Sequence, residues 1–230
     1  MKARTGECVY CAQVGPITDD HVPPKALWGK PRPDDLVVVP SCEGCNSGAS
    51  KDDEYFKTMI VLKDKAGSHP EAVAIRDSVF RGLAMPRKAG FKNHILASML
   101  RVPMHSPAGV YLGHAPAFDV SLKRLDLVVA RITRGLYWHH NDSQRLPTAA
   151  HVVVWSEAGL ADIDSEAAAN LRTHLVEPCL AQPERTLGRG VLRYWYSPSD
   201  RPQMTGWVYE FFGDVRFVAF TLPEGARREV

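Results

Sequence analysis

Apolar positions along the chain follow two different periods, and the change of period separates helical from extended regions. Helical spacing predicts a helix that begins near Ser50 and ends near Leu62, followed by helices over 71–83, 89–100, 121–138 and 165–176. Short runs rich in β-branched and aromatic residues predict strands over 151–155, 190–196, 206–212 and 215–220. The pair Gly213-Asp214 lies between the last two strands and is typical of a hairpin turn.

The order of these elements predicts an α+β protein. The C-terminal strands follow one another closely, which favours an antiparallel sheet with helices packed on one face. The N-terminal segment has its own order: an extended stretch, a loop, a second extended stretch and then a helix. We therefore expect an N-terminal module over 1–66 and an α+β domain over 67–230, with the boundary near Gly67-Ser68-His69-Pro70.

Composition and charge exclude several classes of protein. Hydrophobic residues make up 45% of the chain and charged residues 23%, which is typical of a globular protein. The longest apolar runs are far too short to span a bilayer, and residues 1–20 contain no apolar stretch typical of a secretory signal. We expect a cytoplasmic protein that does not contact membranes. The net charge of +2 is too small to indicate a nucleic-acid-binding protein by itself.

Four of the five cysteines form two pairs of identical spacing. Cys8 and Cys11 make one CxxC pair, and Cys42 and Cys45 make the other. In a reducing compartment two such pairs indicate a tetrahedral zinc site rather than disulfides. A shell of four thiolates leaves no position for a substrate, so we expect this zinc to be structural. The fifth, Cys179, is expected to be a buried apolar side chain.

Thirty residues separate the two pairs, and this insertion carries the candidate chemistry. It contains Asp20-His21 followed by Val22-Pro23-Pro24, and Asn46 comes directly after the second cysteine pair. The two prolines end regular structure just after His21, which predicts that the histidine lies at the end of a strand. At such a strand end the side chains of Asp20 and His21 are expected to face one pocket.

This compound pattern resembles the HNH endonuclease family in its zinc-containing, ββα-metal form. The resemblance covers residues 5–60 and rests on the two CxxC pairs around Asp20-His21 and the prolines, with Asn46 at the end. It implies that His21 is the general base and that Asp20 and Asn46 bind a catalytic Mg²⁺ or Mn²⁺ ion. Asp35 matches the middle position of the family motif, where it would hold the loop that carries the histidine.

Two positions depart from the family pattern. Asp35 (or Asp34) stands where the family usually has asparagine, and Asn46 stands where it usually has histidine. Both replacements keep an oxygen that can accept a hydrogen bond or bind a hard cation. Asp52 or Asp53 is an alternative ligand to Asn46, and Asp34-Asp35 is also typical of a simple turn before a strand.

The C-terminal region has no comparable catalytic motif. Residues 76–101 contain six basic residues and one acidic residue, which favours a surface that contacts phosphates. The candidate nucleic-acid-binding residues are Arg81, Arg87, Lys88 and Lys92. An ordinary solvated helix face is the alternative interpretation. The role of the domain over 67–230 stays unassigned, with binding of substrate or of a partner as the expectation.

We therefore expect a metal-dependent endonuclease that hydrolyses phosphodiester bonds of nucleic acid, with DNA favoured over RNA by the resemblance. The modest net charge leaves room for a protein partner that delivers the substrate. The rival hypothesis is a non-catalytic zinc module that binds nucleic acid or protein and carries a degenerate HNH site. The departures at Asp35 and Asn46 keep this rival open.

Overall fold

The structure is a computed structural model that describes residues 4–63, 65–106, 108–161 and 163–226. The chain divides into two compact units. One contains the residues up to Ile75 together with those from Leu122 onward, and the other contains Arg76–Ser121. Both units combine helices with antiparallel strands, so the predicted α+β class is confirmed. The first unit includes residues on both sides of the boundary expected near residue 67.

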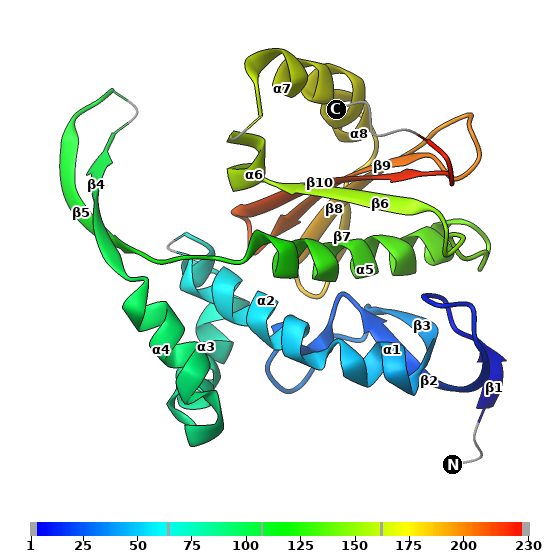
Figure 1. The fold of residues 1–230 in the computed structure, drawn as a ribbon, viewed down its shortest axis with the longest axis horizontal. Helices are drawn as coiled ribbons and strands as arrows, with labels where there is room; N and C mark the ends of the chain where they lie inside the picture. The colour runs from blue at the N-terminus through cyan, green and yellow to red at the C-terminus, as the bar shows by residue number, and fades with distance from the viewer. Residues whose placement is uncertain (1–3, 64, 107, 162, 227–230) are drawn as a thin grey trace. The chain divides into compact units, whose positions relative to one another are not determined.

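The first unit begins with a three-stranded antiparallel sheet in the order β1-β2-β3, followed by two helices (Figure 1). The bounds are β1 (Arg4–Glu7), β2 (Val14–Val22), β3 (Val37–Cys42), α1 (Glu43–Gly48) and α2 (Ser50–Leu62). Asp52 and Asp53 lie in the first turn of α2, where carboxylates favour the helix dipole. The apolar positions behind them are buried, so α2 forms as the sequence pattern predicts.

The same unit ends with a five-stranded antiparallel sheet in the order β6-β10-β9-β8-β7. Its strands and the helices around them are α5 (Leu122–His140), β6 (His151–Ser156), α6 (Glu157–Ala161), α7 (Ser165–Leu171), α8 (Glu177–Leu180), β7 (Arg185–Leu187), β8 (Leu192–Pro198), β9 (Thr205–Phe211) and β10 (Val215–Leu222). A π-helical turn joins α7 to α8. The four strands predicted here are present, and β7 is added at the edge.

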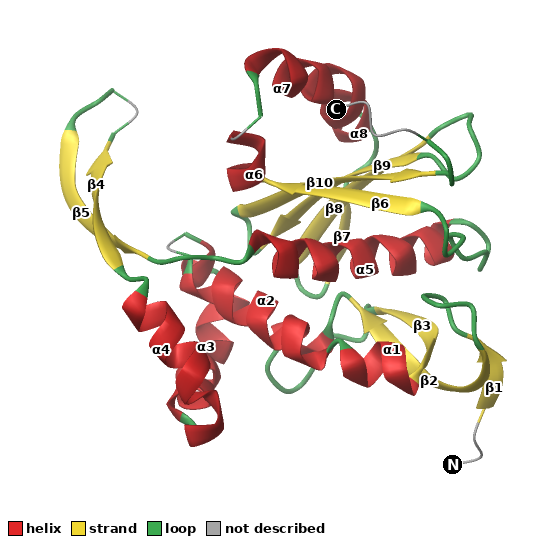
Figure 2. Ribbon diagram, in the orientation of Figure 1, coloured by secondary structure: helices red, strands yellow, loops and turns green. Residues whose placement is uncertain are grey.

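Helices cover both faces of this sheet, whereas one covered face was predicted (Figure 2). On β9, Tyr209 points toward α5, because its hydroxyl lies 2.8 Å from Thr133 Oγ1. Gly206 lies on the opposite face, where an added Cβ would be 2.7 Å from the sulfur of Cys179 in α8. The π-helical turn and α8 thus cover a face of the sheet that the strand pattern alone did not require to be buried.

The N-terminal and C-terminal segments of the first unit share one core. The ring of Phe56 in α2 lies 5.1 Å from that of Phe211 in β9 and 5.9 Å from that of Phe217 in β10. Helix α5 contacts the five-stranded sheet on one side and β2, β3 and α2 on the other. This common core is the physical reason why residues before and after the predicted boundary form one compact unit.

The second unit contains most of α3 (Pro70–Ala84), then α4 (Ala89–Ala97), β4 (Leu100–His105) and β5 (Tyr111–Ala117). Strands β4 and β5 pair into a two-stranded ribbon that was not predicted. Pro103 and Pro116 interrupt the strand pattern, which hid it from the sequence analysis. Among the helices of the described residues, none has the length and apolar character needed to cross a bilayer.

Candidate functional site

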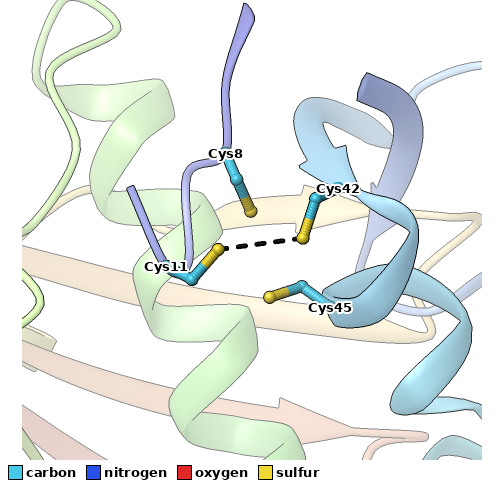
Figure 3. A group of neighbouring side chains, drawn as sticks. All are labelled: Cys8, Cys11, Cys42 and Cys45. Carbon is cyan, nitrogen blue, oxygen red and sulfur yellow. Dashed lines mark hydrogen bonds between the residues drawn. The ribbon is translucent and has the colours of Figure 1, made fainter. Parts of the chain in front are cut away.

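The four paired cysteines meet at one end of the N-terminal sheet (Figure 3). Cys8 and Cys11 lie in the turn between β1 and β2, Cys42 ends β3, and Cys45 lies in α1. Their sulfur atoms all lie within 4.8 Å of one another, and those of Cys11 and Cys42 are 3.7 Å apart. A zinc–sulfur bond of about 2.3 Å gives a tetrahedron with edges of about 3.8 Å, so the spacing fits.

The local environment of the thiols also suits a metal ion. Burial opposes ionisation of Cys8, but backbone N–H groups outweigh burial and lower its pKa to about 6. Burial raises the pKa of Cys45, so a bound cation is needed to displace its proton. The four cysteines are therefore positioned to hold a metal ion, and their arrangement is consistent with structural zinc.

Strand β2 carries the predicted Asp20-His21 pair. The strand extends to Val22, and its antiparallel pairing with β3 places Asp20 opposite Val39 and His21 opposite Val38. Successive side chains of a paired strand point to opposite faces of the sheet, so Asp20 and His21 diverge. His21 lies one residue before the end of β2, as predicted, but the expectation that both side chains face one pocket is wrong, because regular pairing with β3 continues through Val22.

His21 lies on the more exposed face of β2. Its side chain is half-buried, and its Nδ1 is buried without a hydrogen-bond partner among the residues that the structure describes. Burial lowers the pKa of His21 from its ordinary value of 6.5, and the nearby charges of Lys25 and Arg32 lower it further. The imidazole is therefore neutral at pH 7 and able to accept a proton.

Asp20 lies on the opposite, buried face, within a cluster of polar side chains. The hydroxyl of Tyr10 donates to Asp20 Oδ2 at 2.8 Å, and Arg131 Nε lies 3.9 Å from the same oxygen. Arg131 Nη2 donates to both carboxylate oxygens of Asp53, at 2.9 and 2.8 Å. These contacts tie β2, α2 and α5 to the turn that carries the first cysteine pair.

The cluster is well shielded from solvent, and this determines its charges. The side chains of Asp20, Arg131 and Asp53 are 7%, 12% and 14% exposed. Burial alone would lower the pKa of Arg131, but the two carboxylates outweigh it and raise that pKa, so the guanidinium stays charged. Burial raises the pKa of Tyr10, so its phenol keeps the proton that it donates to Asp20.

Asn46 lies in α1, close to strand β2. Its amide nitrogen donates to Thr18 Oγ1 at 3.0 Å and to the backbone oxygen of Asp19 at 3.3 Å. Thr18 is two positions before Asp20, so it lies on the same face of the strand. Asn46 thus holds the start of the helix against the face that carries Asp20.

Asp35 lies in the loop before β3 and contacts a different part of the first unit. Its side-chain oxygen accepts a hydrogen bond from the backbone N–H of Gly188 at 3.0 Å. The indole of Trp28 donates to the oxygen of Gly188 at 2.8 Å. The aspartate therefore fixes the loop that follows the histidine, but it does so through the β7–β8 turn.

In their observed positions, the side chains around Asp20 do not form a binding site for a divalent ion. A hard cation would need the carboxylate oxygens of Asp20 together with oxygens from Asn46 or from the helix that follows. In the structure the carboxylate of Asp20 already contacts Tyr10 and Arg131. The guanidinium of Arg131 also binds Asp53, so it occupies the side of Asp20 that faces Asp53. The positive charge expected from an ion is already supplied there by Arg131.

The four candidate nucleic-acid-binding residues belong to the second unit. Arg81 lies in α3, Arg87 and Lys88 in the turn before α4, and Lys92 in α4. Arg81, Arg87 and Lys92 are exposed, and Lys88 is half-buried.

Two members of the Asp20 cluster were not predicted from the sequence, and Asp53 was expected only as an alternative ligand. Tyr10 stands between the cysteines of the first pair, and Arg131 lies in the helix predicted over 121–138, away from its apolar stripe. A buried arginine within an amphipathic helix gives no distinct pattern, so only the fold reveals its partners. A cavity of about 350 Å³ lies elsewhere in the first unit, and none of the predicted site residues lines it.

Comparisons with protein-family models, with curated proteins and with solved structures found no match to this chain.

Proposed function

We propose that this protein is an HNH-type endonuclease that hydrolyses phosphodiester bonds of nucleic acid, DNA by preference, with His21 as the general base. One observation carries the proposal. The β2–β3 hairpin holds His21 next to its connecting loop, is bordered by the cysteine cluster and is followed directly by helices α1 and α2. That order of hairpin, cysteine cluster and helix is the arrangement that the motif resemblance implies.

The surroundings of His21 support the proposed chemistry. Hydrolysis of a phosphodiester needs a base that takes a proton from water and positive charge that stabilises the phosphate as it reacts. The neutral imidazole meets the first need, since burial and nearby cations keep its pKa below 6.5. Lys25 and Arg32 are exposed and close enough to affect His21, so they supply positive charge where a phosphate would approach.

The resemblance also implies a divalent ion, but the side chains around Asp20 do not fit one. The side chains of Asp20 and Asn46 are hydrogen-bonded to Tyr10 and Thr18 instead of to an ion. Arg131 supplies a positive charge beside Asp20. The proposal therefore rests on His21 and the cations around it. Whether cleavage depends on Mg²⁺ or Mn²⁺ is part of the test.

The test compares cleavage of supercoiled plasmid and of single-stranded RNA by the unmodified protein and by His21→Ala. Each is incubated with Mg²⁺, with Mn²⁺ and with EDTA. Loss of a general base should lower the cleavage rate by about 100-fold or more. His21 is half-buried and its Nδ1 has no described partner, so the variant should keep the fold, as checked by circular dichroism. His139→Ala removes an exposed histidine of α5 and is the matched control.

The pH profile adds a second readout. The neutral imidazole is the active form, so the rate should rise with pH through a value below 6.5 and stay level through pH 7. Equal cleavage by the unmodified protein and His21→Ala, or a midpoint above 6.5 for the rise, would contradict the role given to His21.

A second function is favoured by the surroundings of Asp20. Its carboxylate is committed to Tyr10 and Arg131, which is what a degenerate HNH site would show. In that case the protein is a non-catalytic zinc module that binds nucleic acid or protein. Binding of DNA or RNA that is unchanged by His21→Ala, with no cleavage under any of the conditions above, would favour this second function.

A further inference from the structure

The carboxylates of Asp20 and Asp53 lie on two sides of one guanidinium. Arg131 Nη2 binds both oxygens of Asp53, and Arg131 Nε faces Asp20 at 3.9 Å. Its Nη1 is buried without a hydrogen-bond partner among the described residues, so attraction between opposite charges, rather than complete hydrogen bonding, holds the group in place.

We propose that Arg131 is a built-in cation that occupies the place of a divalent ion between Asp20 and Asp53 and closes this site to such ions. The inference uses the proposed function only to identify Asp20 as the position where an HNH-type site would hold metal. The contacts of Arg131 with Asp20 and Asp53 are present whether or not the protein cleaves nucleic acid.

The fold holds the helix that carries Arg131 firmly in place. Its helix neighbours Val129 and Ile132 are fully buried, and so is Leu136 one turn further along α5. Helix α5 also packs against the five-stranded sheet, so the helix that carries Arg131 cannot move away unless the core of the unit opens. An arginine side chain also stays charged at every pH up to about 12. A flexible lysine could move aside for a metal ion, and a histidine could lose its charge near neutral pH. The arginine at this site differs from both.

Removing the guanidinium should create the metal site that its presence prevents. Without Arg131, the oxygens of Asp20, Asp53 and Tyr10 would face one another across a small, shielded space. Hard divalent cations prefer such oxygen ligands, and two buried carboxylates without a counter-charge are unstable unless a cation binds. Arg131→Met keeps an uncharged stem that ends where the guanidinium begins, so it leaves the carboxylates in place and the space between them free.

The experiment measures binding of Mn²⁺ by electron paramagnetic resonance, with zinc already bound and in a His21→Ala background. Cleavage is not the readout, so an inactive protein does not affect the outcome. Arg131→Met should gain about one Mn²⁺ site per chain, at least about tenfold tighter than any site of the parent. Adding Asp53→Asn to this variant should remove the site. Mn²⁺ should raise the melting temperature of Arg131→Met but not that of the parent.

Arg134→Met is the matched control. Arg134 lies one turn further along α5, and its guanidinium binds the backbone oxygens of Leu146, Pro147 and Ala150 instead of carboxylates. Its loss removes a partly buried arginine from the same helix without leaving acidic partners, so it should create no Mn²⁺ site. A gain of the same size in Arg134→Met would overturn the inference.

A measurement on the parent protein keeps the inference testable if Arg131→Met fails to fold. Bound Mn²⁺ broadens the nuclear magnetic resonance signals of nearby groups, so the ring signals of Tyr10 report directly on the cluster. We expect them to stay sharp at Mn²⁺ concentrations that broaden exposed acidic sites. Selective broadening of Tyr10 in the parent would show that a divalent ion enters beside Arg131 and would overturn the inference, as would a folded Arg131→Met that gains no site.

Discussion

Asp20 and His21 are adjacent in the chain but have different surroundings. The side chain of Asp20 is 7% exposed and faces Tyr10 and Arg131, while His21 is half-buried on the other face of β2. The alternation of side chains in a paired strand causes this difference. The burial of one neighbour in a charged cluster therefore does not prevent the other from meeting a ligand at the surface.

The cysteine cluster leads to a prediction about single residues. Cys42→Ser should reduce bound zinc from about one ion per chain to nearly none, because a serine hydroxyl is a poor replacement for a thiolate. The melting temperature should fall as well, since metal binding and local folding are coupled. Zinc content is measured by elemental analysis, and unfolding by circular dichroism.

Cys179→Ala is the matched control for this prediction. Cys179 is 1% exposed in α8 and is not part of the four-cysteine group. The substitution should lower stability slightly through lost packing and leave the zinc content at about one ion per chain. If Cys42→Ser kept its zinc, or if both variants lost it equally, the assignment of the four ligands would be wrong.

At the scale of elements, the loop between β2 and β3 depends on the turn between β7 and β8. Trp28 donates to the backbone oxygen of Gly188, and Asp35 accepts from its backbone N–H. Gly188 has a positive φ of 62°, and a Cβ there would overlap the indole of Trp28. The glycine thus provides both the backbone conformation and the space that bring this loop close to the C-terminal sheet.

Gly188→Ala should therefore destabilise the protein through two separate effects. A left-handed conformation costs a non-glycine residue about 1 kcal/mol, and overpacking against Trp28 adds about 1–3 kcal/mol. We expect a total of about 2–4 kcal/mol, measured by urea unfolding followed through tryptophan fluorescence. The emission of Trp28 should also shift to longer wavelength, because the displaced indole meets water.

Gly213→Ala separates the two effects. Gly213 also has a positive φ, of 72°, but an added Cβ would meet nothing within 4 Å. Its substitution should cost only about 1 kcal/mol, which is the conformational part. Equal losses for the two variants would mean that the contact between Trp28 and the turn contributes nothing.

At the scale of the whole molecule, positive charge is concentrated in one of the two compact units. Residues 76–121 contain six basic and two acidic residues, although the whole chain has a net charge of only +2. A basic surface in one unit attracts phosphates even when the total charge is nearly balanced. This distribution supports the prediction that the second unit binds the backbone of nucleic acid.

Replacing Arg81, Arg87, Lys88 and Lys92 with glutamine should weaken binding to a DNA duplex. The slope of log affinity against log salt concentration should become shallower by up to about 0.9 for each phosphate contact that is lost. Fluorescence anisotropy at several salt concentrations measures both quantities. Stability should change little, because three of the four residues are exposed.

Matched pairs of substitutions control for the loss of charge alone. Arg81→Gln with Arg87→Gln removes two exposed cations from the second unit, and Arg172→Gln with Arg201→Gln removes two from the first. Only the first pair should weaken binding and change the salt dependence strongly. Equal effects from both pairs would show that net charge, rather than the surface of the second unit, determines affinity.

Most elements with strong periodicity could be predicted from the sequence. Helix α5 lies at 122–140 where 121–138 was predicted, and β9 and β10 lie within two residues of their predicted bounds. The ribbon of β4 and β5 could not be predicted, because prolines and a glycine interrupt its alternation of polar and apolar residues. The covered second face of the large sheet was also missed, since β-branched and aromatic strands look alike whether one or both faces are buried.

The sequence by itself determined the cysteine cluster and the order of hairpin and helix, because both depend on spacing over a short stretch of chain. CxxC pairs form local turns, and prolines and turn residues limit the strands between them. Only the tertiary structure decided which side chains surround Asp20. Arg131 lies 78 residues from Asp53, and the two meet because the apolar stripe of α5 is buried between the large sheet and the N-terminal module. That burial turns the polar side of the helix toward two carboxylates, where desolvation makes a paired cation necessary.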